Sequence, residues 1–188
     1  MQTKFILHGG FTPKKENEDN SDFYKEILKD APRNVRILII PFAKDIERIA
    51  PTTERVMREF NQYRWQEKLD FEVANEQSFT AQVRSADIVY FQGGTSVKLL
   101  GVLKRFPGLK ELLKGKIVAG ESAGANVLGM FFFSPSANGV FEGLGILPVK
   151  IIPHYKEEYK DAFMDIGPGL ESVFLKEYEF RVINRISF

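Results

Sequence analysis

The sequence contains no cysteine and only two histidines, His8 and His154, among its 188 residues. The absence of cysteine excludes disulfide bonds, thiolate zinc sites, iron–sulfur clusters and a cysteine nucleophile. Two histidines are too few for most histidine-based metal sites, and the sequence has no His-Glu-x-x-His pair. We therefore expect neither a metal ion nor another cofactor.

Charge of one sign and long apolar runs are also lacking. The chain has 26 Lys and Arg residues against 25 Asp and Glu residues, a net charge of +1, which disfavours a nucleic-acid partner. The apolar runs at 37–40 and 130–133 are far shorter than the roughly 20 residues that span a bilayer. The run at 5–7 is too short for a signal-peptide core. We expect no membrane contact and a cytoplasmic location.

Short apolar runs that end at glycine or proline alternate with segments of helical spacing. The runs predict buried strands at 5–7, 35–40, 88–91 and 117–119. The helical spacing predicts helices around 23–28, around 56–60 with Thr52 or Thr53 as N-cap, and around 99–103. This alternation predicts an α/β fold of three layers, a mostly parallel sheet with helices on both faces, in one domain over 1–188.

The loops that leave these strands predict where a site lies. They carry Gly9-Gly10, Pro41, Gly93-Gly94 and Gly120, and ligands bind at the carboxyl ends of strands in such sheets. The polar segment 14–20 is typical of a solvated loop. The alternation of polar and apolar residues from 171 to 188 predicts one or two antiparallel edge strands with a structural role only.

The strongest chemical signal is Gly120-Glu121-Ser122-Ala123-Gly124, which follows directly on the apolar run 117–119. In a nucleophile elbow the serine lies on a strained turn between a strand and a helix, and its neighbours must be small. The start of the helix also presents amide groups beside the serine hydroxyl, where an oxyanion develops. Ser122 is therefore the candidate nucleophile, and we expect the side chain of Glu121 to extend into solvent.

A serine hydroxyl needs a base, and neutral imidazole suits that role near pH 7. His154 ends another apolar run and is the histidine downstream of Ser122, so it is the candidate base. His8 also ends a strand, but we expect a structural role for it. The α/β-hydrolase fold is excluded, because it places an acid and then a histidine well downstream of the serine, and only 66 residues follow Ser122.

Three motifs together resemble the dipeptidase E (aspartyl dipeptidase) and cyanophycinase family of serine peptidases. They are Gly120-Glu121-Ser122-Ala123-Gly124-Ala125, the upstream Tyr90-Phe91-Gln92-Gly93-Gly94-Thr95 with Leu99-Leu100, and the downstream Pro153-His154-Tyr155. The resemblance covers roughly residues 5–154 and implies a class I glutamine amidotransferase-like, flavodoxin-like fold. It also implies an acyl-enzyme mechanism that needs no cofactor.

The resemblance assigns roles to individual residues. Ser122 matches the nucleophile and His154 the general base, while the backbone amides of Gly93, Gly94 and Ala123 match the oxyanion hole. The family has an acid between nucleophile and base, and Glu142 is the acid in that interval of this chain. Glu157, Glu158 or a backbone carbonyl are the alternatives for orienting His154.

The leading interpretation is thus a serine hydrolase that cleaves small peptides, as a dipeptidase does. A non-peptidase amidase or esterase is an alternative, because the same machinery suits any acyl substrate. A binding or regulatory protein that has lost efficient catalysis is another alternative, which the unsettled acid favours. The expected partner is a small peptide or amide, and a homodimer is left open.

Overall fold

The computed structural model describes residues 2–12, 19–65 and 67–185, so most of the predicted loop 14–20 lies outside the described part. Its larger sheet has the strand order β10-β1-β5-β4-β2-β3. The strands are β1 (Thr3–His8), β2 (Asn34–Ile40), β3 (Lys68–Val73), β4 (Ile88–Phe91), β5 (Ile117–Glu121) and β10 (Phe180–Arg185). All neighbouring strands pair in parallel except β10, which runs antiparallel to β1.

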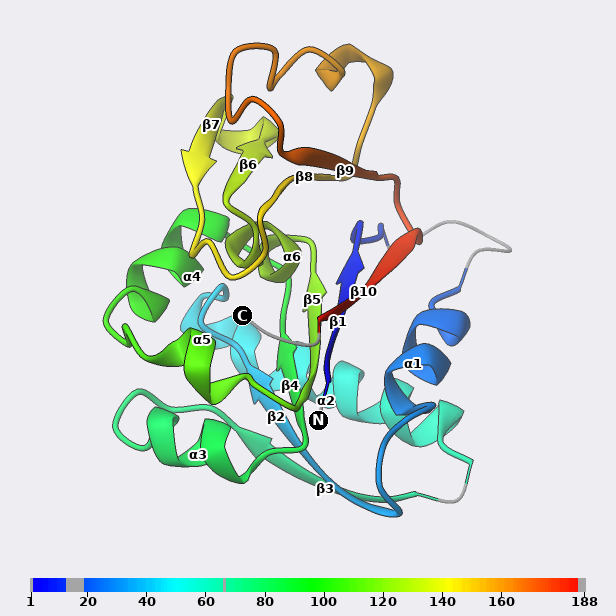
Figure 1. Ribbon diagram of the computed structural model, residues 1–188. Helices are drawn as coiled ribbons and strands as arrows, with labels where there is room; N and C mark the ends of the chain where they lie inside the picture. The colour runs from blue at the N-terminus through cyan, green and yellow to red at the C-terminus, as the bar shows by residue number, and fades with distance from the viewer. Residues whose placement is uncertain (1, 13–18, 66, 186–188) are drawn as a thin grey trace.

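A second sheet of four strands has the order β7-β6-β8-β9. Its strands are β6 (Phe131–Ser134), β7 (Gly139–Glu142), β8 (Val149–Pro153) and β9 (Glu171–Leu175), and β8 runs parallel to both β6 and β9. Figure 1 shows this sheet beyond the tips of β1 and β5. It therefore lies at the edge of the larger sheet where a parallel α/β fold binds ligands.

Helices cover both faces of the larger sheet, which confirms the predicted three-layer α/β fold (Figure 1). One face carries α1 (Ser21–Leu28) and α2 (Ile46–Tyr63), and the other carries α3 (Phe79–Ser85), α4 (Ser96–Leu103), α5 (Leu109–Leu112) and α6 (Ala123–Leu128). Two short 3₁₀ turns, η1 (Pro135–Ala137) and η2 (Glu157–Tyr159), complete the elements.

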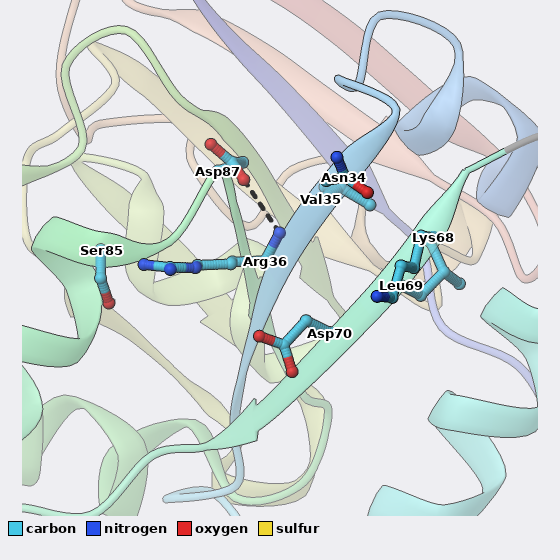
Figure 2. A pocket seen from close by; sticks show the side chains of 8 residues that line it. All are labelled: Asn34, Val35, Arg36, Lys68, Leu69, Asp70, Ser85 and Asp87. Carbon is cyan, nitrogen blue, oxygen red and sulfur yellow. Dashed lines mark hydrogen bonds between the residues drawn. The ribbon is translucent and has the colours of Figure 1, made fainter.

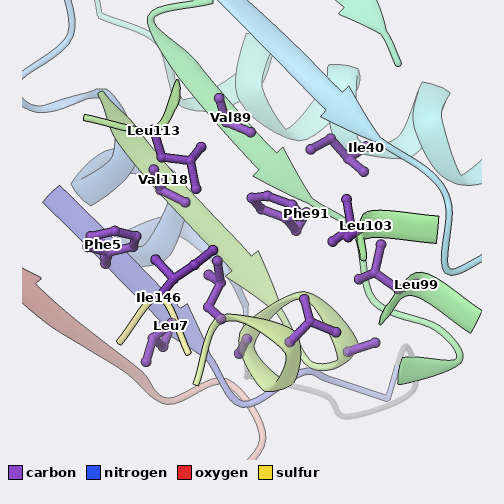
Figure 3. Packing of buried hydrophobic residues seen from close by; sticks show 14 of the residues in the cluster. Phe5, Leu7, Ile40, Val89, Phe91, Leu99, Leu103, Leu113, Val118 and Ile146 are labelled. Atoms are coloured by element: carbon purple, nitrogen blue, oxygen red, sulfur yellow. The ribbon is translucent and has the colours of Figure 1, made fainter. Parts of the chain in front are cut away.

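The inner strands β1, β4 and β5 of the larger sheet are buried along their length because both faces of the sheet are covered. In β1, Phe5 and Leu7 pack with α3 to α6, while Ile6 between them packs with α1 and α2. Figure 3 shows the first of these clusters, with Phe91 of β4 facing Leu103 of α4. The buried packing on both sides holds the carboxyl ends of β1, β4 and β5 in a fixed register.

Three details differ from the sequence predictions. Helix α2 begins at Ile46 with Asp45 as N-cap, and the Thr52 hydroxyl lies inside the helix, donating to the Arg48 carbonyl at 2.6 Å. Strand β3 was not predicted, because it is a partly exposed edge strand without an apolar run. Of the two C-terminal strands, β10 is the predicted antiparallel edge strand, whereas β9 pairs in parallel with β8.

No helix in the described part of the chain is long and apolar enough to cross a membrane.

Candidate active site

Ser122 lies on a strained turn between β5 and α6. Its φ of 49° and ψ of −103° lie in a region that non-glycine residues rarely adopt. The flanking glycines allow the tight turn: a Cβ on Gly120 would lie 2.6 Å from the Gly124 carbonyl carbon, and a Cβ on Gly124 would collide with the Phe91 carbonyl oxygen. The predicted need for small residues around the serine is confirmed.

This close packing carries a prediction about stability. Gly124→Ala should lower the free energy of unfolding by about 2 to 3 kcal/mol, because the new methyl group meets the backbone of β4 rather than a movable side chain. Gly101→Ala in α4 is the matched control. Nothing lies within 4 Å of its added Cβ, and we expect it to raise the stability by up to about 1 kcal/mol. Urea unfolding of the two variants checks the difference, and equal effects would contradict the packing argument.

His154 lies directly after β8, and its imidazole reaches the serine. Ser122 Oγ and His154 Nε2 are 3.0 Å apart. The His154 side chain is 39% exposed, so a substrate can approach this pair from solvent. The structure therefore brings together the two side chains that the sequence singled out, from positions 32 residues apart.

The carboxylate on the other side of His154 belongs to Glu177, in the turn between β9 and β10. Glu177 Oε1 lies 3.2 Å from His154 Nδ1 and accepts a second hydrogen bond from the Thr12 hydroxyl at 2.7 Å. A carboxylate at Nδ1 favours the tautomer with the proton on Nδ1, which leaves Nε2 as an acceptor for the Ser122 hydroxyl. The arrangement Ser122–His154–Glu177 has the connectivity of a Ser-His-acid triad.

The expectation that Glu142 orients His154 is therefore not met. Glu142 is an exposed residue at the end of β7, paired in the strand ladder with Phe131. The other two acids are engaged elsewhere: Glu157 accepts from the Tyr155 hydroxyl at 3.2 Å, and Glu158 pairs with Lys156 at 3.6 Å.

Sequence reasoning missed Glu177 because it assigned the C-terminal stretch a structural role only. The available signal was the polar turn Lys176-Glu177-Tyr178-Glu179 between two alternating strand segments, which returns the chain to the sheet edge. This turn puts an acid beside the carboxyl ends of β1 and β8. The stretch after 171 thus contributes to the site as well as to the fold.

The glycine pair after β4 lies against the same elbow. A Cβ on Gly93 would lie 3.4 Å from Ser122 Cβ, and Gly94 has a φ of +147° and packs against the Ala43 carbonyl. Among the described residues, no backbone hydrogen bond uses the amides of Gly93, Gly94 or Ala123. Gly93 lies beside Ser122, and Ala123 follows Ser122 directly in the chain.

Glu121 does not extend into solvent as expected; its carboxylate is buried on the α2 face of the sheet. Glu121 Oε2 accepts a hydrogen bond from the Tyr90 hydroxyl at 2.7 Å and pairs with Arg55 Nη2 at 3.4 Å. Burial alone would raise the pKa of Glu121, but the Arg55 guanidinium and the Tyr90 hydroxyl hold it below its usual value. The carboxylate next to Ser122 is thus ionised and paired.

His8 is fully buried at the end of β1, as a structural residue would be. Burial lowers its pKa to about 4, so the imidazole is neutral at pH 7. Its Nδ1 accepts a hydrogen bond from the Gly10 amide at 3.0 Å, which places the ring proton on Nε2.

The lowered pKa of His8 predicts a loss of stability in acid. In the unfolded chain His8 takes up a proton near pH 6.5, whereas in the folded chain it does so only near pH 4. As the pH falls from 6.5 to 4, protonation of His8 therefore favours the unfolded chain and should lower the free energy of unfolding by about 3 kcal/mol. His8→Asn cannot titrate and should lose about 3 kcal/mol less between pH 6.5 and pH 4 than the wild type. Urea unfolding at several pH values measures this difference, and parallel stability curves would contradict it.

The described residues contain no group of three or more His, Asp or Glu side chains placed to hold a metal ion. A cleft of ≈ 700 Å³ lies at the opposite edge of the sheet, at the amino-terminal ends of β2 and β3. Figure 2 shows the Arg36 side chain in this cleft extending toward Ser85. The backbone amide of Arg36 donates a hydrogen bond to the Asp87 carboxylate. The cleft contains none of the candidate catalytic or oxyanion-hole residues, so it is separate from the Ser122 site.

Comparison with known proteins gives the family of the chain. The model of peptidase family S51 matches residues 5–171, which include Ser122 and His154. The chain belongs to peptidase family S51. The matched range contains the elbow and the residues after β8 but stops before Glu177. The dipeptidase E and cyanophycinase resemblance is thereby confirmed, and this S51 chain is a peptidase by family.

Two solved structures share the fold of this S51 chain. A candidate peptidase E protein from Listeria monocytogenes EGD-e is 20% identical, with a TM-score of 0.65 and 100% of both chains covered. A peptidase from an acI-B1 Actinobacterium is 23% identical, with a TM-score of 0.68, 97% of this chain covered and 84% of the other. No curated protein sequence matches this chain. At these identities the two structures support the flavodoxin-like peptidase E fold.

Proposed function

We propose that this S51 family member is a serine peptidase whose catalytic triad is Ser122, His154 and Glu177. The observation that carries the proposal is the continuous chain of contacts from Ser122 Oγ to His154 Nε2 at 3.0 Å and from His154 Nδ1 to Glu177 Oε1 at 3.2 Å. The strained backbone of Ser122 supports it, because strain at a nucleophile elbow is part of how the hydroxyl is presented.

The first half of the reaction transfers the acyl group to the enzyme. Ser122 Oγ attacks the carbonyl carbon of the peptide bond as its proton passes to His154 Nε2, and the Glu177 carboxylate stabilises the imidazolium that forms. The negative oxygen of the tetrahedral intermediate accepts hydrogen bonds from the amides of the Gly93-Gly94 pair and of Ala123. His154 then protonates the leaving amine, the carbon–nitrogen bond breaks, and an ester to Ser122 remains.

The second half releases the product. Water attacks the ester carbonyl while its proton passes to His154 Nε2, and the second tetrahedral intermediate uses the same amides. When this intermediate collapses, His154 returns the proton to Ser122 Oγ and the carboxylic acid leaves. The chain's own side chains supply nucleophile, base and acid, so no step requires a cofactor.

The substrate class we propose is a small peptide, as for the dipeptidase E members of the family. The contact of Glu177 with His154 supports an active enzyme over an inactive binding protein, because a carboxylate lies where a triad acid would orient the base. An amidase or esterase would use the same three side chains, so the substrate must be decided by experiment.

Hydrolysis of an Asp-x dipeptide library beside a simple ester tests the proposal. We expect the wild type to cleave peptides and Ser122→Ala to lose the activity, because the Ser122 hydroxyl is the one in contact with the proposed base His154. A wild type that cleaves the ester but no peptide would favour the esterase. A wild type no faster than Ser122→Ala on every substrate would contradict a serine hydrolase.

A further inference from the structure

The turn at the end of β1, His8-Gly9-Gly10, contacts the elements that carry all three triad residues. The triad members come from three separate places in the chain: the end of β5, the end of β8 and the turn between β9 and β10. Two consecutive carbonyl groups of the turn accept hydrogen bonds from the backbone amides of the nucleophile and the base. The Ser122 amide donates to the His8 carbonyl at 3.0 Å, and the His154 amide donates to the Gly9 carbonyl at 2.8 Å.

The third carbonyl of the turn binds the segment that carries the acid. The Tyr178 amide, next to Glu177, donates to the Gly10 carbonyl at 2.9 Å, and the Gly9 amide donates to the Glu179 carbonyl at 2.8 Å. The relative positions of the nucleophile, the base and the acid therefore all depend on backbone hydrogen bonds to one short turn.

The turn also lies directly against the reacting atoms. A Cβ on Gly10 would lie 3.0 Å from Ser122 Cβ and would overlap the His154 imidazole at Nε2. Gly10 has a φ of +83°, and glycine adopts this conformation with the least strain. A small rotation of the Gly10 backbone would therefore change the distance between the Ser122 and His154 side chains.

One side chain holds the turn in this conformation. The Gly10 amide has the His8 Nδ1 as its acceptor at 3.0 Å, in a buried position. The imidazole is itself held by burial and by the Phe23 ring, whose centroid lies 4.3 Å away. Without His8 the buried Gly10 amide would lack this acceptor, which favours a different orientation of the peptide.

We infer that His8 is a positioning residue of this enzyme, which fixes the His8-Gly9-Gly10 turn and through it the relative placement of Ser122, His154 and Glu177. The inference rests on the proposed function, because it assigns His8 to the assembly of that triad. His8 touches neither substrate nor the transferred proton. Its effect is to hold the carbonyl groups that the three elements share.

A series of substitutions at His8 separates this role from a merely structural one. Asparagine accepts a hydrogen bond from the amide two residues onward, as His8 does from Gly10, serine does so more weakly, and alanine not at all. The probe is a fluorophosphonate, which reacts with an activated serine whatever the natural substrate. The readouts are the maximal labelling rate kinact and the half-saturating concentration KI, with folding checked by circular dichroism.

We expect kinact to fall in the order wild type, His8→Asn, His8→Ser, His8→Ala. The loss in His8→Ala should be about 10- to 100-fold, since a buried amide loses its acceptor, while KI changes by less than about threefold. If His8→Ala does not fold, kinact of His8→Asn is compared with kinact of His8→Ser, and we expect the larger value for His8→Asn. Folded variants whose kinact is equal to the wild type, or does not follow acceptor strength, would overturn the inference and leave the triad standing. A wild type that is not labelled would overturn the triad itself, and the inference with it.

Discussion

Replacing His154 by alanine is expected to lower kcat for peptide hydrolysis by about 10⁶-fold, close to the loss seen when a serine protease loses its base or nucleophile. The reason is that His154 Nε2, 3.0 Å from Ser122 Oγ, is the acceptor for the proton that the serine must lose. The side chain is 39% exposed, so the variant should remain folded. Steady-state kinetics on the best peptide of the library measures the change, and a loss below tenfold would rule out His154 as the base.

Glu177→Gln is expected to lower kcat by about 10⁴-fold with little change in the fold, as when the acid of a serine protease triad becomes an amide. The glutamine keeps the shape of the carboxylate but can present its NH₂ group to His154 Nδ1, which then favours the proton on Nε2. That tautomer cannot accept the Ser122 proton. The measurement is kcat together with the rate of fluorophosphonate labelling.

Glu142→Gln is the matched control for this prediction. It makes the same chemical change at the acid that the sequence favoured, on the exposed end of β7. We expect its kcat to stay within about twofold of the wild type, as for a surface change away from the site. A large loss in Glu142→Gln with none in Glu177→Gln would reverse the assignment of the acid.

Ser122 and His154 could be singled out from the sequence because their signals are local. Ser122 is marked by small residues on either side of it, and the structure shows why, since Gly120 and Gly124 leave no room for a Cβ. His154 ends an apolar run that becomes β8. The sequence predicts one sheet edge for both side chains, but β8 belongs to the smaller sheet and β5 to the larger one, so their meeting depends on how the two sheets pack.

The contact of Glu177 with His154 could not be predicted because it depends on how two sheets meet. Glu177 lies between β9, an edge strand of the smaller sheet, and β10, an edge strand of the larger one. No periodicity in the sequence shows that β9 pairs with β8 or that β10 pairs with β1. The same long-range pairing brings the Tyr178 amide to the Gly10 carbonyl.

The position of Glu121 was mispredicted for a related reason. A charged residue is exposed more often than buried, and that general tendency favoured solvent. Its actual partners, Tyr90 on β4 and Arg55 on α2, lie 31 and 66 residues upstream. Burial of a carboxylate becomes favourable only with such partners, and they are visible only once the layers have been assembled.

Mass spectrometry of the protein after reaction with a fluorophosphonate shows whether Ser122 is an activated nucleophile. We expect one adduct per chain, on the peptide that contains Ser122, and no adduct in Ser122→Ala or after acid unfolding. The absence of an adduct on the folded wild type, or an adduct on a different side chain, would contradict this expectation.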